Sequence, residues 1–282
     1  MRYLIGLAGT LALCFLTQTL GLQAVGGETA KSESNYFSTI ARIQTGSTRS
    51  PKAILLGSSL TGRMADRAAR VDGIVNLGCD GGSAAVTLRA IDRGLIDAAP
   101  VVVIEVNTLA YDLDGRGSQI SEAISGPWFQ VGRQHRNLGA TSRPTAFAYS
   151  WLISKKEGPP APIERSLPIQ SRPALYPGPG SEGLTPMEAG YVDELVDIID
   201  RLQGRGCRVV LVMLPPGEVE GSAELRVARA LGERSNAEWW DLTRGLPEDT
   251  VLFTDGRHME AESAAMTMGT LQKGLMGTLP GG

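Results

Sequence analysis

Short apolar runs that alternate with helical patterns constrain the fold of this chain more than any other feature of its sequence. The run at residues 101–106 is apolar except for Glu105, as expected for a central strand of a parallel sheet, which is buried on both faces. Similar runs lie at residues 53–57, 73–77 and 208–214, and stretches with helical spacing separate them. Such alternation is typical of βαβ units. The sequence therefore predicts a three-layer α/β/α sandwich with about five parallel strands.

One long segment, at about residues 110–186, interrupts this alternation. Its first part contains a helical pattern near residues 146–153, and its second part has eight prolines between Pro159 and Pro186. A loop of this length is uncommon in a compact domain unless it is functional or disordered. Both a surface excursion and a lid or substrate-binding insert fit this composition. We expect residues 28–282, with this insert, to form one domain.

The first 27 residues resemble an export signal. Arg2 precedes an apolar stretch at residues 3–16, and small residues follow at 23–27, where a signal peptidase could cut. The polar break at residues 17–19 favours a cleaved signal peptide. An uncleaved anchor needs about 20 apolar residues, and residues 3–25 nearly supply that length. Under either interpretation, the globular part is expected in the periplasm or outside the cell.

The cysteines are not expected to form a disulfide. Cys79 follows the second expected strand, whereas Cys207 precedes the fourth. In a parallel sheet these positions lie at opposite ends of the strands, too far apart for disulfide geometry. Cys14 follows Leu13, a residue too large for lipoprotein processing, so a lipid anchor is not expected either.

Composition and missing motifs exclude several classes of function. The chain has a formal net charge of −3 and no basic run, so nucleic acid is not an expected partner. It has two histidines, which argues against a histidine-rich zinc site, and no metal or other cofactor is expected. It lacks a Walker A loop, a Rossmann glycine fingerprint and the Gly-x-Ser-x-Gly elbow of α/β-hydrolases.

Polar residues and glycines stand where the apolar runs end. Ser58 and Ser59 follow the first run, Gly78 follows the second, and Asn107 follows the third. A further polar loop, residues 254–259, precedes the last expected helix. Because ligands bind at the carboxyl ends of the strands in open α/β sheets, we expect all four to share one rim.

This rim contains the components of a nucleophilic serine site. A serine nucleophile needs a base, and the base needs an acid that orients it. His258 lies three residues after Asp255, so one turn of chain can join the carboxylate to the imidazole. His135 has no acid near it in sequence and is interpreted as a surface or substrate-contacting residue. Ser59 is the expected nucleophile, with Ser58 as its rival.

The same rim offers donors for an oxyanion. The backbone amides of Ser59 and Gly78 and the side-chain amide of Asn107 could stabilise the negative charge on an attacked carbonyl oxygen. Taken singly, Gly78 is better explained as a turn glycine, and Asn107 as a turn or helix-cap residue.

Taken together, these residues resemble the SGNH/GDSL hydrolase superfamily. The match covers roughly residues 53–270 apart from the insert, and its blocks are Gly57-Ser58-Ser59-Leu60, Asn76-Leu77-Gly78, Glu105-Val106-Asn107 and Asp255-Gly256-Arg257-His258. The resemblance implies a flavodoxin-like fold in which Ser59, His258 and Asp255 form the catalytic triad. It also implies an oxyanion hole made by Ser59, Gly78 and Asn107. The chain departs from the family pattern at Ser58, which replaces an aspartate, at Glu105, which replaces a glycine, and at Thr108, which replaces a second aspartate.

These departures resemble exported branches of the family that acylate or deacylate cell-surface polysaccharides and teichoic acids. The leading expectation is an esterase that removes an acyl group, such as acetyl, from a carbohydrate. An O-acyltransferase that receives its acyl group from a membrane partner protein is the alternative, and a non-catalytic carbohydrate-binding or assembly protein is a third. Tyr111 and Trp128 are candidate residues for stacking on sugar rings, although core packing explains either equally well.

Overall fold

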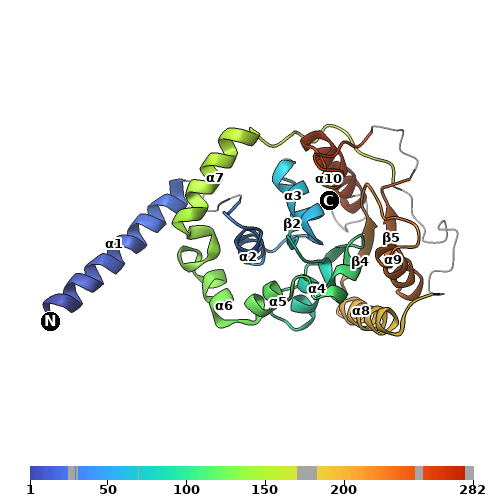
Figure 1. Cartoon of the computed structure of the whole chain (residues 1–282), viewed down its shortest axis with the longest axis horizontal. Coiled ribbons are helices and arrows are strands. Elements are labelled where there is room, and N and C mark those ends of the chain that lie inside the picture. Colours follow the sequence, from blue (N-terminus) through green and yellow to red (C-terminus); the bar gives the residue numbers. More distant parts are fainter. Residues whose placement is uncertain (25–28, 30, 69, 170–182, 245–249, 277–282) are drawn as a thin grey trace.

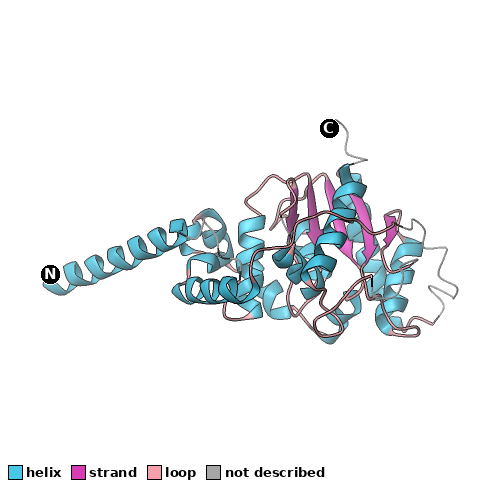
Figure 2. Ribbon diagram, turned by 90° about the horizontal axis from the view of Figure 1, so that it is seen from above, coloured by secondary structure: helices cyan, strands magenta, loops and turns pink. Residues whose placement is uncertain are grey.

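A computed structural model describes the chain except for residues 25–28, 30, 69, 170–182, 245–249 and 277–282. Its centre is a five-stranded, all-parallel sheet in the order β2-β1-β3-β4-β5 (Figure 2). The strands are β1 (Ala53–Leu56), β2 (Ile74–Asn76), β3 (Val101–Glu105), β4 (Arg208–Met213) and β5 (Glu238–Asp241). Helices cover both faces of the sheet (Figure 1). The predicted α/β fold with about five parallel strands is confirmed.

Alternate strand residues fill two separate cores, one on each face of the sheet. Ile54 and Leu56 face the core that also contains side chains of α2 (Asn35–Gly46), α4 (Ala84–Asp92), α8 (Pro186–Gly204) and α9 (Ala223–Arg234). Ala53 and Leu55 face the second core, which contains side chains of α3 (Ser59–Arg67) and α10 (Ala261–Met276). The sheet is therefore buried on both faces, which explains the continuous apolar runs in the sequence.

Strand β5 follows the same rule. Trp239 and Trp240 are both buried, at 3% and 5% exposure. Trp239 packs into the first core and Trp240 into the second, because helices cover this edge strand on both sides.

Side-chain caps begin the helices that follow the strands. Ser58 caps α3 and Ser83 caps α4, each by accepting a hydrogen bond from a backbone amide of the first turn. Thr185 and Glu188 form a complete capping box at the start of α8. These caps fix the point at which the chain turns from loop to helix, including the turn that carries Ser59.

The insert is more helical than its sequence suggested. It contains η1 (Leu109–Asp114), α5 (Ser118–Ser125), α6 (Pro127–Gln134), η2 (Arg136–Leu138), η3 (Ala140–Ser142) and α7 (Pro144–Glu157). Helix α6 packs against α2, and the extended segment after α7 runs along α3 and α10, where Ala161 pairs with Ala68 and Leu167 bonds to Thr270. These described parts line the domain's flank, while residues 170–182 lie outside the described residues.

The N-terminal segment forms one apolar helix, α1 (Arg2–Ala24), which is long enough to cross a membrane. The helix continues through the polar stretch at residues 17–19. The hydroxyls of Thr17 and Thr19 donate to the carbonyls of Leu13 and Phe15, both at 2.8 Å, so their polarity is satisfied within the helix. The expected cleavage region falls partly on residues 25–28, outside the described residues.

The cysteines are free thiols, as expected. Cys79 is buried just after β2 and Cys207 is half-buried just before β4, at opposite ends of the strands. Cys14 is exposed on α1.

Candidate active site

The sheet topology creates a binding position between β1 and β3. Chain connections leave these two adjacent strands toward opposite edges of the sheet, because the order is β2-β1-β3-β4-β5. In doubly wound folds, ligands bind at the carboxyl ends of the strands at such a switch point. Ser59 follows β1 and Asn107 follows β3, so both residues stand at this position.

The structure brings Ser59, His258 and Asp255 into one hydrogen-bonded chain. The Oγ atom of Ser59 lies 3.0 Å from Nε2 of His258, and Nδ1 of His258 lies 2.7 Å from Oδ2 of Asp255. Because a carboxylate only accepts hydrogen bonds, Nδ1 carries the proton and Nε2 is left to accept from the serine. This is the arrangement that a general base needs in order to activate a nucleophilic hydroxyl.

The loop that carries Asp255 and His258 is ordered by its own backbone. Oδ1 of Asp255 accepts from the amides of Arg257 and His258 at 3.1 and 2.8 Å. The amide of Thr254 donates to the carbonyl of His258 at 2.8 Å, and Gly256 provides the positive φ of 77° that the turn requires. Hydrogen bonds from the His258 amide and side chain hold the pKa of Asp255 well below its ordinary value. The carboxylate therefore remains charged beside the imidazole.

Ser58, the rival nucleophile, points away from His258. It is buried at 2% exposure, and its hydroxyl donates to the carboxyl of Glu105, with both oxygens at 3.0 Å. The same Oγ accepts from the amide of Leu60 at 3.1 Å and so caps α3. Ser59, by contrast, is partly exposed beside the imidazole. Ser58 thus has a structural position, whereas Ser59 is the serine that lies beside the imidazole.

The buried carboxyl of Glu105 accepts the hydrogen bonds that hold this turn in place. Its carboxyl is fully buried and accepts from the amide of Ser58 at 2.8 Å and from the hydroxyl of Thr108 at 2.9 Å, in addition to the Ser58 hydroxyl. Burial raises the pKa of the Glu105 carboxyl, and its hydrogen bonds, including one from the Thr61 amide, oppose that rise. Gly57 leaves room for it, because a Cβ there would lie 2.4 Å from Oε2 of Glu105. Both departures from the SGNH pattern at Ser58 and Glu105 therefore meet in one contact.

The three expected oxyanion donors differ in whether their N–H groups already donate to an acceptor within the protein. Among the described residues, the Ser59 amide at the first position of α3 has no acceptor. The Gly78 amide donates to Oδ1 of Asn76 at 2.6 Å. Nδ2 of the fully buried Asn107 donates to the carbonyl of Leu214 at 2.9 Å, and the Asn107 side chain also donates to the carboxyl of Glu218. Of the three donors, the Ser59 amide is therefore the one that this geometry leaves open to a substrate oxygen.

Glu218 is a site residue that the sequence reasoning missed. Its carboxyl is 5% exposed, accepts from Arg257 at 2.8 Å, and receives a hydrogen bond from the Asn107 side chain. Burial raises its pKa to about 7, against the opposing effects of Arg257 and Asn107. Glu218 follows β4 after the sequence Pro215-Pro216-Gly217, so the strand-end rule would have identified it if it had been applied to the fourth strand.

Arg63 is a second residue that the sequence reasoning missed. It lies one helical turn after Ser59 on α3, and its Nη1 is 3.2 Å from Nδ1 of His258 and 3.8 Å from Oδ2 of Asp255. Since Nδ1 donates to Asp255, Arg63 acts as a positive charge beside that carboxylate. The i, i+4 spacing from Ser59 is the sequence signal that could have found it.

The two aromatic candidates lie in different places. Tyr111 on η1 borders the site, because the guanidinium carbon of Arg257 lies 5.6 Å from its ring centre. Trp128 lies on α6, is 79% exposed, and lines a pocket of about 680 Å³ together with Tyr36 and Phe37. The structure therefore brings Tyr111 toward the triad and leaves Trp128 outside it. His135 is exposed between α6 and η2, also outside the triad.

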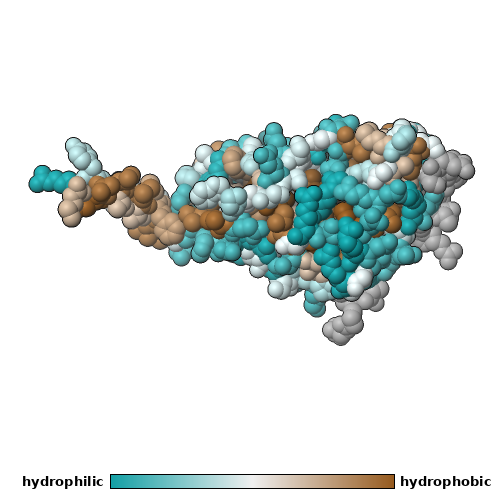
Figure 3. Space-filling model, turned by 90° about the horizontal axis from the view of Figure 1, so that it is seen from below, coloured by the Kyte–Doolittle hydropathy of each residue, from teal (hydrophilic) through white to brown (hydrophobic). Residues whose placement is uncertain are grey.

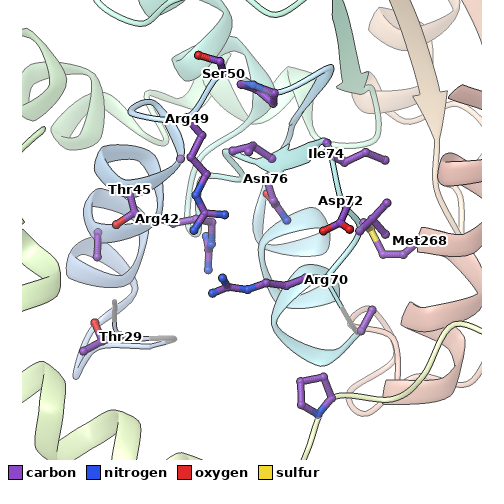
Figure 4. Close-up of a pocket in the computed structure, with 18 residues that line it drawn as sticks. Thr29, Arg42, Thr45, Arg49, Ser50, Arg70, Asp72, Ile74, Asn76 and Met268 are labelled. Atoms are coloured by element: carbon purple, nitrogen blue, oxygen red, sulfur yellow. The ribbon is translucent and has the colours of Figure 1, made fainter. Parts of the chain in front are cut away.

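Another pocket, of about 570 Å³, lies along the edge strand β2 (Figure 4). Arg42, Arg49 and Arg70 reach into it, and Arg42 is engaged by Asp80 at 3.2 Å. None of the described residues that line it belongs to the triad. Nor do any three His, Cys, Asp or Glu side chains form a metal-binding group within the described parts of the chain.

Comparison with known proteins identified no relative of this chain. No protein-family model, no curated protein and no solved structure matches the chain.

Proposed function

We propose that this protein is an exported serine esterase that removes an acyl group, such as acetyl, from a cell-surface or extracellular carbohydrate. The observation that carries the proposal is the relay from Ser59 to His258, at 3.0 Å, and on to Asp255, at 2.7 Å. Hydrogen-bond contact between nucleophile and base, with the base held by a third group, is the signature of covalent acyl transfer. The N-terminal apolar helix supports a location outside the cytoplasm.

The first half-reaction forms an acyl-enzyme. Nε2 of His258 accepts the proton as Oγ of Ser59 attacks the ester carbonyl, and the charged Asp255 stabilises the imidazolium. The Ser59 amide donates to the negative charge that develops on the carbonyl oxygen, and the Asn107 amide can join it by exchanging its bond to Glu218 for one to that oxygen. When the carbon–oxygen bond to the sugar breaks, His258 returns the proton to the departing hydroxyl.

The second half-reaction reverses these roles. His258 takes a proton from water, the resulting hydroxide attacks the acyl-enzyme, and Ser59 leaves as a hydroxyl that regains its proton. The buried contact between Ser58 and Glu105 supports this sequence, because it keeps the turn fixed while the neighbouring Oγ moves between free and acylated forms. Preorganisation of this kind matters, since a displacement of about 1 Å can cost roughly 100-fold in rate.

An O-acyltransferase is the second candidate, favoured by the N-terminal helix. Its last turns pack into the domain through Leu22, which is 5% exposed, and through a bond of 3.0 Å between Asn137 and Thr19. A helix held in this way fits a retained anchor, which would keep the enzyme beside a membrane protein that supplies acyl groups. The acyl-enzyme on Ser59 would then transfer to a sugar hydroxyl in place of water.

Hydrolysis of p-nitrophenyl acetate by the purified full chain tests the proposal. We expect turnover in the wild type, loss of turnover in Ser59→Ala, and near-normal turnover in a Ser142→Ala control. Addition of an oligosaccharide acceptor then separates the two candidates: acetylated sugar as product supports transfer, and acetate alone supports hydrolysis. Absence of both turnover and acyl-enzyme in the wild type would contradict the catalytic proposal.

A further inference from the structure

Exposed apolar side chains gather on the insert, close to helix α1. Apart from Met1 and α1, the exposed large apolar residues in the described parts of the chain are Trp128, Leu138, Trp151, Leu152, Met187, Val219 and Leu252. The first four belong to α6, η2 and α7. Exposed apolar groups concentrated on one part of a soluble domain indicate a contact surface.

The elements that carry these side chains surround the end of α1. Asn137 of η2 donates to the Thr19 hydroxyl at 3.0 Å, and Leu138 is the next residue. Gly21 packs against the ring of Phe147 on α7, where an added Cβ would lie 3.0 Å from Cε2. Trp151 is four residues after Phe147 and so lies on the same stripe of α7, one turn further along. Leu138, Trp151 and Leu152 therefore flank the point at which α1 leaves the domain; we call them the flanking patch.

Helix α1 itself has the properties of a membrane span. Its 23 residues extend about 34 Å, but its last turns pack on the domain, and the exposed residues 2–17 extend about 24 Å of a hydrocarbon core of about 30 Å. The half-buried turn that follows must therefore also lie within the bilayer, beside the flanking patch. Residues 1–17 are exposed in the folded chain, so no part of the described domain covers them. Arg2, at the end of α1 farthest from the domain, provides the positive charge that is expected on the cytoplasmic side of a membrane span. Figure 3 shows the apolar surface along α1 continuing to its junction with the domain.

We propose that α7 and η2 lie on the outer surface of the bilayer that α1 crosses, with the flanking patch in the lipid interface. Tryptophan favours this zone because its ring combines an apolar body with a polar N–H. Lys155 and Lys156, exposed in the last turn of α7, suit anionic lipid headgroups. Figures 1 and 2 show α1 leaving the domain on the side of α7, with the sheet on the opposite side. The lipid contact would hold the catalytic rim in a fixed orientation to the membrane, whichever reaction it performs.

Tryptophan quenching by brominated lipid tests this placement in the full chain. Of the four tryptophans, Trp239 and Trp240 are buried in the sheet and serve as internal references. The protein would be reconstituted as Trp128→Phe, which leaves Trp151 as the one exposed indole, and as Trp128→Phe/Trp151→Phe. The vesicles would contain phosphatidylcholine and phosphatidylglycerol, with or without bromine near the headgroup end of the acyl chains.

We expect bromine to lower the fluorescence of Trp128→Phe and to leave the double variant nearly unchanged. Equal bromine quenching of both variants, or no quenching of either, would overturn the proposal. So would a mature protein isolated from its membrane or periplasmic fraction that begins after residue 24, because the anchor would then be absent.

Discussion

The hydroxyl of Ser58 donates to the buried carboxyl of Glu105, with both carboxyl oxygens at 3.0 Å. These are two of the three positions at which the sequence departs from the SGNH pattern, and they lie 47 residues apart in the chain. The contact joins the turn that carries Ser59 to the end of the neighbouring strand β3. The two departures are therefore one structural feature, in which an acid on β3 holds the turn that carries Ser59.

Glu105 should act as a positioning residue for Ser59. In Glu105→Ala, the amide and hydroxyl of Ser58 and the hydroxyl of Thr108 would lose a buried acceptor. A buried group left without a partner costs about 1–3 kcal/mol, so we expect a loss of roughly 3 kcal/mol in the free energy of unfolding, measured in urea. We also expect kcat to fall while KM changes little. Glu105→Gln, which keeps an acceptor oxygen, should restore part of both; an unchanged kcat in a folded Glu105→Ala protein would count against this role.

Gly57 should tolerate no side chain. A Cβ at this position would lie 2.4 Å from Oε2 of Glu105 and 2.4 Å from Oγ1 of Thr61. Overpacking of this kind costs about 1–3 kcal/mol, so Gly57→Ala should lower the melting temperature and the esterase rate together. Gly190→Ala is the matched control, because nothing lies within 4 Å of an added Cβ on α8. There we expect a gain of about 0.5–1 kcal/mol; equal effects at the two positions would contradict the packing argument.

Glu218 should make stability depend on pH between about 4.5 and 7. Burial raises its pKa from 4.5 to about 7 in the folded protein, with Glu224 and Glu105 adding to the rise and Arg257 opposing it. Across this range the folded state keeps a proton that the unfolded state loses, so the free energy of unfolding falls as pH rises. Glu218→Gln should reduce that slope in unfolding curves recorded at several pH values. Glu164→Gln, which removes an exposed carboxylate, should leave the slope as it is; identical slopes in wild type and Glu218→Gln would refute the assignment.

Asp255 should be needed for orientation of His258. In Asp255→Asn the side chain could donate to Nδ1 and stabilise the wrong tautomer, with the proton on Nε2, where it cannot accept from Ser59. The corresponding change in a serine protease lowers kcat by about 10⁴-fold, and we expect a loss of about 10³–10⁴-fold here. Asp97→Asn, at an exposed residue paired with Arg133, is the control for charge alone. A rate within a few-fold of wild type in Asp255→Asn would show that this carboxylate does not orient the base.

Much of the fold could be predicted because it depends on local patterns. Strands β1, β3 and β4 are buried on both faces and so appear as continuous apolar runs. Helices α5 and α6 were not predicted, since they are short and interrupted by glycine and proline at residues 126–127. The helical continuation of α1 through residues 17–19 depends on hydroxyl-to-carbonyl bonds that a hydropathy pattern does not contain.

The candidate triad could be selected from sequence because the chain has two histidines and one of them follows an aspartate by three residues. The contacts that distinguish Ser59 from Ser58 could not be predicted from sequence. They join residues that are far apart in the chain, and they depend on the direction in which each hydroxyl points. Trp128 was a poor candidate for the same reason. The rule that sites form at strand ends does not apply to residues of an insert. Trp128 lies on α6, which packs against α2 at the side of the domain.

Covalent labelling with a fluorophosphonate tests the central claim most directly, because the reagent reacts with a serine only where a base activates it. The account predicts one phosphonyl group per chain, with fluoride as the leaving group, located on Ser59 by peptide mass spectrometry. Labelling should persist in Ser58→Ala and disappear in Ser59→Ala and His258→Ala. A label on Ser58, or no label on a folded wild-type protein, would contradict the assignment of Ser59 as the nucleophile.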